Sequence, residues 1–230
     1  MMNAGLQALS IEHCRDPQFA SAGLRAAVNS NVAAHIDLDS SDRFDRIPAV
    51  RPSPENSGNV EHVRAARNML VSQQSRAFGS KREWLAALQS TNYDVLLVDA
   101  FYNGNEPLSK EEVHSLKFKQ IGARRQVYAI VNAGYAEDQR CCWQRDWQIG
   151  SPTWIKAYHD SPGQYVIEFW NPAWKAIIGR YLEGVIDLGF DGVVLDGVEA
   201  YRRWEFQTPV DPKTSGLIEE SEDEMDMDAP

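Results

Sequence analysis

Three acidic residues end apolar, strand-like runs of the sequence and are the first candidates for chemistry. Asp196 ends GFDGVVLD, Asp99 ends YDVLLVD, and Glu12 ends LQALSIE. Side chains alternate along a strand, so each acid shares a face with small or aliphatic residues before it. Ligands of parallel α/β folds bind beyond the carboxyl ends of the strands. Three acids at three strand ends would surround such a binding site. There one carboxylate could act as acid and another as base or nucleophile.

A simpler interpretation of the same acids stays open. An aspartate that follows a strand is often a turn former or the N-cap of the next helix. Asp196 is followed by Gly197, which suits a turn, and Glu199 stands three positions further on. The sequence alone does not choose between a catalytic and a turn-forming Asp196.

The segment 135–174 is rich in tryptophan and is the second candidate feature. It holds five of the seven tryptophans of the chain, namely Trp143, Trp147, Trp154, Trp170 and Trp174. A tryptophan ring offers a flat apolar face and a polar edge, which suits a sugar, although the rings can also pack the loop onto the body. We assign Trp174 to the core because it lies on the apolar face of a predicted helix, and regard Trp143 and Trp170 as sugar-platform candidates.

These residues must be positioned by an alternation of strands and helices. The predicted strands are 6–12, 32–36, 68–73, 93–101, 126–134 and 191–196, and the predicted helices are 20–30, 79–90, 108–122 and 171–189. Repeated strand–helix units indicate a parallel sheet with helices outside it. The predicted fold class is therefore α/β of the (β/α)8 TIM-barrel type, incomplete or permuted, with about six recognisable strands.

Composition divides the chain into four segments. Residues 1–46 form a strand–helix–strand segment, 47–59 a linker rich in Pro, Ser, Asn and Gly, and 60–206 the main (β/α) region. We expect 207–230 to be a disordered acidic tail. Seven of the acids behind the net charge of −10 lie in 219–228, so the rest of the chain has a net charge of only −3.

Several functional classes are not supported by the sequence. There is no basic stripe for nucleic acid and no apolar run of the roughly 20 residues that cross a bilayer. The N-terminus lacks the pattern of a signal peptide, which indicates a cytoplasmic protein as the sequence is written. Neither metal-ligand spacings nor cofactor motifs are found, and the vicinal Cys141 and Cys142 are interpreted as two half-buried thiols rather than a redox pair.

A specific family resemblance rests on five strings that occur in one order. They are YDVLLVDAFYNGNEPLSKEEVHSLK, GYAEDQRCCWQRDW, SPTW, YVIEFWNPAWKAII and GFDGVVLDGVEAY, within residues 60–205. Together they resemble glycoside hydrolase family 114, the endo-α-1,4-polygalactosaminidase-like TIM barrels, some of which were once mislabelled as cysteinyl-tRNA synthetases. The N-terminal ALSIEHCRDPQF resembles a part of this family that elsewhere forms late barrel strands.

The resemblance implies a set of site residues. Asp196 matches the strand-end aspartate of the family, Asp99 matches the aspartate of its IDxF motif, and Glu199 stands at its DxxDAY acid. The catalytic candidates are therefore Asp196, Glu199 and Asp99. The candidates for substrate binding are Glu137, Asp138, Arg140, Trp143, Trp170, Tyr201 and Glu12. The chain departs from the family pattern at Tyr135, which replaces a glutamate.

The resemblance also implies the activity. We expect a glycoside hydrolase that cleaves an α-linked galactosaminoglycan-type polysaccharide, without cofactor or metal, by carboxylate acid–base catalysis. The partner of Asp196 is left open among Glu199, Asp99 and Glu12. Relatives are often secreted. The alternatives are a degenerate barrel that binds polysaccharide without cleaving it, a fragment that self-associates, and an acidic interaction protein.

Overall fold

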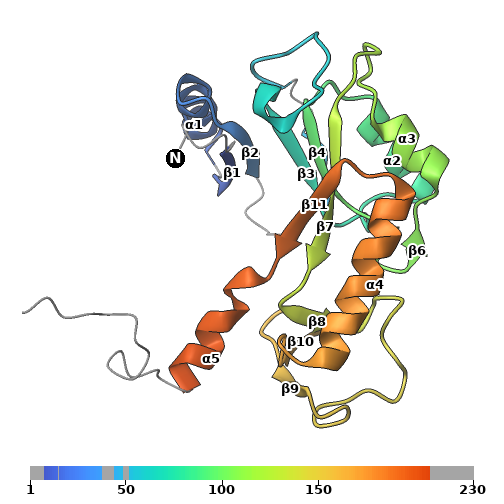
Figure 1. Ribbon diagram of the computed structural model, residues 1–230. Coiled ribbons are helices and arrows are strands. Elements are labelled where there is room, and N and C mark those ends of the chain that lie inside the picture. The colour runs from blue at the N-terminus through green and yellow to red at the C-terminus, as the bar shows by residue number, and fades with distance from the viewer. Residues whose placement is uncertain (1–7, 15, 38–43, 49–51, 208–230) are drawn as a thin grey trace, which may run out of the picture.

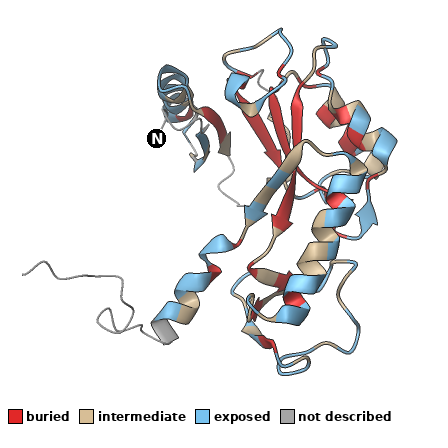
Figure 2. Ribbon diagram, viewed as in Figure 1, coloured by how far each residue is buried: buried red, intermediate tan, exposed pale blue. Residues whose placement is uncertain are grey.

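The main feature of the fold is an open parallel sheet of four strands. The structure is a computed structural model that describes residues 8–14, 16–37, 44–48 and 52–207. The strand order is β11-β7-β4-β3, and each neighbouring pair is parallel. The four strands are β3 (Met69–Ser72), β4 (Val95–Asp99), β7 (Gln126–Asn132) and β11 (Gly192–Asp196). In Figure 2 the first three are buried for most of their length, whereas β11 lies at the edge with Val193 and Leu195 exposed.

A second, two-stranded parallel sheet precedes the main one in the chain. Its strands β1 (Leu9–His13) and β2 (Ala33–Asp37) are joined by helix α1 (Pro17–Asn29), and β2 packs beside β3 (Figure 1). The described residues thus contain six parallel strands, the number predicted from the sequence. The α/β class with a parallel sheet is confirmed, and within the described residues the strands do not close into a barrel.

Three helices cover one face of the main sheet (Figure 1). They are α2 (Lys81–Gln89), α3 (Lys110–Leu116) and α4 (Pro172–Leu188). Each begins at a predicted N-cap, because the side chains of Ser80, Ser109 and Asn171 accept backbone N–H bonds of the first turn. Helix α4 ends at Gly189, whose φ of 86° is the left-handed conformation that glycine tolerates best.

Helix α3 is shorter than the sequence predicts. The pattern indicated a helix over 108–122, but α3 ends at Leu116 and the following residues turn inward. The physical reason is Lys119, whose ammonium group is fully buried and donates to Asp94 at 2.6 Å and to the carbonyls of Asn56 and Gly58. A continuing helix would leave the buried Asp94 without its cation. The same contacts anchor part of the predicted linker 47–59.

Arg125 stabilises the same end of the sheet from the start of β7. Its side chain has no exposed surface and donates five hydrogen bonds to the hydroxyl and carbonyl oxygens of Thr91 and the carbonyls of Leu88, Leu116 and Phe118. These carbonyls lie at the C-terminal ends of α2 and α3, where helices present unpaired acceptors. Burial lowers the pKa of Arg125 to about 10.

The two faces of the sheet bury separate clusters. On the helix side, Trp84, Leu88 and Leu116 pack against Leu96 and Val98 of β4. The opposite face buries a cluster whose members come from β2, β3, β4 and β7 and from the segment before β3. Its strand members are Ala33, Met69, Val71, Val95, Leu97 and Ile130, with Tyr128 and Val194 packed against them.

Short elements lie beyond the carboxyl ends of the strands. They are β5 (Phe101–Tyr102), β6 (Glu106–Pro107), β8 (Tyr135–Glu137), β9 (Ile155–Tyr158), β10 (Gln164–Ile167) and the helices η3 (Val198–Ala200) and α5 (Tyr201–Gln207), while η2 (Val63–Ala65) precedes β3. Strands β8, β10 and β9 form an antiparallel sheet within the tryptophan-rich segment. The predicted acidic tail lies outside the described residues from 208 onward.

Candidate active site

Four polar side chains stand where the four strands of the main sheet end. Gln73 follows β3, while Asp99, Asn132 and Asp196 are the last residues of β4, β7 and β11. Each shares its face with residues of the buried cluster opposite the helices, because side chains alternate along a strand. The prediction that Asp99 and Asp196 lie at the same end of one parallel sheet is confirmed.

An open pocket of about 500 Å³ lies over these ends. Its walls come from the segment after β3, the turn between β5 and β6, the residues around β8, the β9–β10 turn and the end of β11. The lining residues are Gln73, Gln74, Ser75, Arg76, Asp99, Asn103, Gly104, Glu137, Gln139, Arg140, Ser161, Pro162, Gly163, Gln164 and Asp196. The tryptophan-rich segment 135–174 therefore supplies one side of the pocket, as the sequence predicted.

A buried ion-pair cluster forms one wall. Both carboxylate oxygens of Asp99 accept from Nη1 of Arg140, at 2.8 and 2.7 Å. Nε of Arg140 donates to Glu137, whose other oxygen accepts from Nε2 of Gln164 at 3.0 Å. Burial raises the pKa of Asp99 to about 6, while Arg140 opposes the rise, so Asp99 is ionised at neutral pH.

Asp196 is held differently, by uncharged donors. Its Oδ1 accepts from the backbone N–H of Gly197 at 2.9 Å and its Oδ2 from Nε2 of Gln73 at 3.1 Å. Burial raises the pKa of Asp196, and the negative charges of Glu199 and Glu137 add to the rise, while the two hydrogen bonds lower it. Asp196 has the backbone contact of a turn residue and also lines the pocket.

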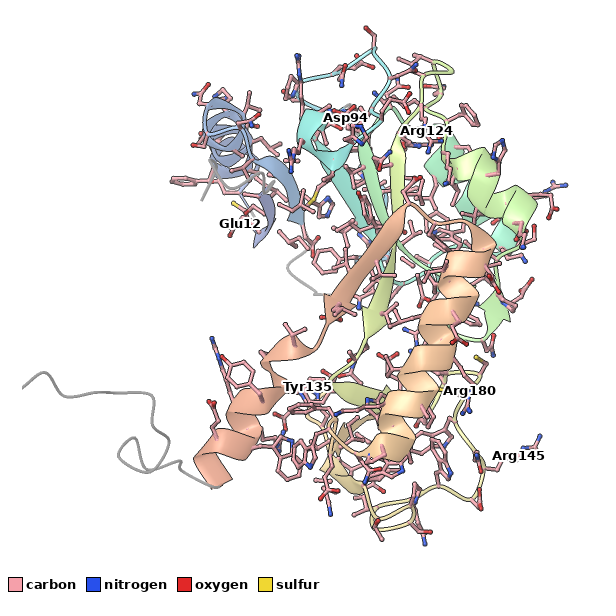
Figure 3. The ribbon with its side chains drawn as sticks, viewed as in Figure 1. Glu12, Asp94, Arg124, Tyr135, Arg145 and Arg180 are labelled. Carbon is pink, nitrogen blue, oxygen red and sulfur yellow. The ribbon has the colours of Figure 1, made fainter. Side chains whose placement is uncertain are left out.

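The other two acids considered as partners of Asp196 do not line the pocket. Glu199 is exposed on η3, near enough to Asp196 to affect its pKa. Glu12 is exposed on β1, where it accepts from the hydroxyl of Ser10. Figure 3 places Glu12 in the N-terminal sheet, well apart from Tyr135 beside the end of β11.

The predicted substrate-binding residues divide into two groups. Glu137 and Arg140 belong to the pocket wall, whereas Asp138 is exposed, does not line the pocket, and donates its backbone N–H to Gly163 of the β9–β10 turn. Trp143 is half-buried and stacks on Tyr165 with 4.5 Å between the ring centroids, and it lines a separate small cavity of about 20 Å³ rather than the pocket over the strand ends.

Two predicted aromatic residues lie outside the pocket. Trp170 and Tyr201 are each 43% exposed, and Trp170 contacts Trp204 at 4.8 Å. Their roles stay predictions. Trp174, by contrast, is a confirmed core residue, since only 4% of it is exposed.

Sequence analysis missed the two glutamines that hold the acids. Gln73 ends a predicted strand in the same position as Asp99 and Asp196, which was an available signal, but an amide does not stand out among strand-end acids. Gln164 gave no local signal, because its role depends on the pairing of β10 with β8, which sets it opposite Glu137.

Other site classes find no support in the part of the chain that the structure describes. Among those residues there is no group of three or more His, Cys, Asp or Glu side chains placed to hold a metal ion. None of the helices formed by them has the length and apolar character needed to cross a membrane.

Comparison with known families gives one broad match. Residues 66–226, which is most of the chain, match the model of glycoside-hydrolase family GH114. The matched region contains Asp99, Arg140, Asp196 and both glutamines.

Individual relatives match over shorter stretches. An uncharacterized protein of Deinococcus radiodurans is 34% identical over 131 residues, or 56% of this chain and 40% of the relative. One of Thermotoga maritima is 32% identical over 132 residues, 53% of this chain and 40% of the relative. The chain thus spans about two fifths of the length of these relatives. Among solved structures, Aspergillus fumigatus Ega3 in complex with galactosamine has a TM-score of 0.37 and 23% identity over 48% of this chain and 39% of that one.

Proposed function

This chain belongs to glycoside-hydrolase family GH114, and on that premise we propose that it cleaves an α-linked galactosaminoglycan-type polysaccharide at the pocket over the strand ends. The observation that supports this most directly is the shared pocket of Asp99 and Asp196. Glycoside hydrolysis commonly requires two carboxyl groups on either side of the scissile bond. Of the three partners considered for Asp196, only Asp99 lines the same pocket.

The two acids have complementary roles in this proposal. Asp196, bound only by uncharged donors, exchanges a proton with the glycosidic oxygen or with water. Asp99, fixed as a carboxylate by Arg140, stabilises the positive charge that develops on the sugar ring. Both stand on rigid strand ends, which favours a fixed geometry.

The charge of the pocket suits an amino sugar. Its lining includes three carboxylates, Asp99, Glu137 and Asp196, and two guanidinium groups, Arg76 and Arg140. The net negative charge is complementary to a protonated sugar amine. A neutral or acidic polysaccharide would gain nothing from it.

The test is hydrolysis of an α-1,4-linked galactosamine polymer, measured as the release of reducing ends. Asp196→Asn should lower turnover by about 10²-fold or more, since Asn cannot transfer a proton, and should leave folding and polymer binding intact. Asp187→Asn, the same change on the exposed surface of α4, is the matched control and should behave as wild type.

Two outcomes would contradict the proposal. An active wild type that tolerates Asp196→Asn would make Asp196 a turn residue only. A wild type that binds the polymer without turnover would favour the alternative of a non-catalytic, polysaccharide-binding barrel. The open sheet, with β11 unpaired on one side among the described strands, is the observation that supports this alternative.

A further inference from the structure

The two strand-end aspartates of the pocket differ in the chemistry of their partners. Asp99 is bound on both oxygens by the guanidinium group of Arg140. Asp196 is bound by the backbone of Gly197 and by the side-chain amide of Gln73. None of the ion pairs formed by the described residues includes Asp196.

This difference decides which acid can gain a proton without losing its partner. A guanidinium group has only donors, so a protonated Asp99 would lose a hydrogen bond and leave the carboxylate of Glu137 as the only counter-charge that contacts Arg140 in the described residues. A glutamine amide has a donor and an acceptor at nearly the same place. Gln73 can therefore donate to the carboxylate of Asp196 or, with the amide turned over, accept from its carboxylic acid.

The contact also bridges the pocket. Gln73 follows β3 and Asp196 ends β11, these two strands are the outermost of the main sheet, and both residues line the pocket. Three strand spacings would separate these strands by about 14 Å in a flat sheet. That is too far for the two side chains to meet, so the 3.1 Å bond requires the sheet to curl around the pocket. The bond fixes Asp196 against the opposite edge of the sheet.

We propose that Gln73 is a positioning residue that holds Asp196 across the pocket in both of its protonation states, and that Asp196, rather than Asp99, is therefore the acid that exchanges a proton. The inference rests on the proposed function for its meaning in catalysis, but the hydrogen bond and its effect on Asp196 can be measured without a substrate.

Other charged or titratable groups around Asp196 must be taken into account. They are Glu137 and Tyr135 of β8, Glu199 of η3, and Asp99, Arg76 and Arg140 of the pocket lining. None of them is altered by a substitution of Gln73. A change in the titration of Asp196 in such a variant is therefore due to the lost or altered amide.

The experiment is a carbon-13 NMR titration of the Asp196 carboxyl group in the full chain. In Gln73→Leu the carboxylate loses a donor, so the pKa of Asp196 should rise by about one to two pH units. In Gln73→Arg a cation replaces the amide, so the pKa should fall below that of the wild type. The matched control is Gln120→Leu, at an exposed glutamine between α3 and β7 that does not line the pocket, and it should leave the titration unchanged.

The outcomes separate the two proposals. If the pKa of Asp196 is the same in Gln73→Leu and Gln73→Arg as in the wild type, the positioning role is wrong. If Gln73→Leu does not fold, Gln73→Arg and the isosteric Gln73→Glu, which should raise the pKa of Asp196 by like charge, still test it. If Gln73→Leu raises the pKa of Asp196 and Gln73→Arg lowers it, but the wild type hydrolyses no polymer, the proposed function is refuted and the positioning role stands. In an active chain, Gln73→Arg should also move the pH profile in the direction of the altered pKa.

Discussion

The closest backbone approach at the candidate site gives the sharpest prediction. Gly134 lies between β7 and β8, where a Cβ atom would stand 1.8 Å from the carbonyl oxygen of Gly197 and 2.9 Å from Cβ of Ala200. These neighbours are backbone atoms and a Cβ atom, so no side-chain rotation relieves the clash. The distance to the oxygen of Gly197 must open to at least 3.0 Å, a displacement of about 1.2 Å.

We therefore expect Gly134→Ala to damage both stability and the site. Forcing an extra methyl group into a packed contact costs about 1–3 kcal/mol of unfolding free energy. Gly197 directly follows Asp196 and donates to it, so the displacement reaches the carboxylate. A misplacement near 1 Å lowers turnover by about 10²-fold.

The measurements are urea unfolding and polymer hydrolysis, with the carboxyl titration of Asp196 as a readout that needs no activity. The matched control is Gly179→Ala in α4, where the added Cβ has no neighbour within 4 Å apart from the adjacent residues and the backbone of its own helix. This helix-interior change should raise the unfolding free energy by about 0.5–1 kcal/mol. A Gly134→Ala variant as stable as the wild type, with an unchanged titration of Asp196, would show that the end of β11 does not lie against Gly134 and would refute the reasoning.

Two further predictions concern stability. Arg125→Lys should lower the unfolding free energy in urea by about 3 kcal/mol, because an ammonium group has three donors for the oxygens that now accept five charge-assisted bonds; an unchanged midpoint would contradict this. Burial raises the pKa of Tyr93 from 10.0 to about 12, so the unfolded chain releases this proton first and stability falls as pH rises through that window. Tyr93→Phe should remove about 2 kcal/mol of that fall, measured by unfolding at pH 10 and pH 12, and an equal fall in both proteins would count against it.

Local patterns were enough to predict much of this fold. The capping residues Ser109 and Asn171 and the stop at Gly189 act within one helical turn, and the alternation of side chains that puts Asp99 and Asp196 on one face acts within one strand. Such features depend on energies of neighbouring residues, which a sequence displays directly. The family strings added the order of the units.

The partners of the acids were decided only by the tertiary structure. Asp99 meets Arg140 from 41 residues away and Asp196 meets Gln73 from 123 residues away, and Glu12, which has the same strand-end pattern as both, faces solvent. Helix α3 stopped early for the same kind of reason, since the buried contact of Lys119 with Asp94 outweighed the local helical pattern. A buried polar group must find a partner wherever the register and curl of the sheet place one, and that choice depends on the whole assembled sheet rather than on any short stretch of sequence.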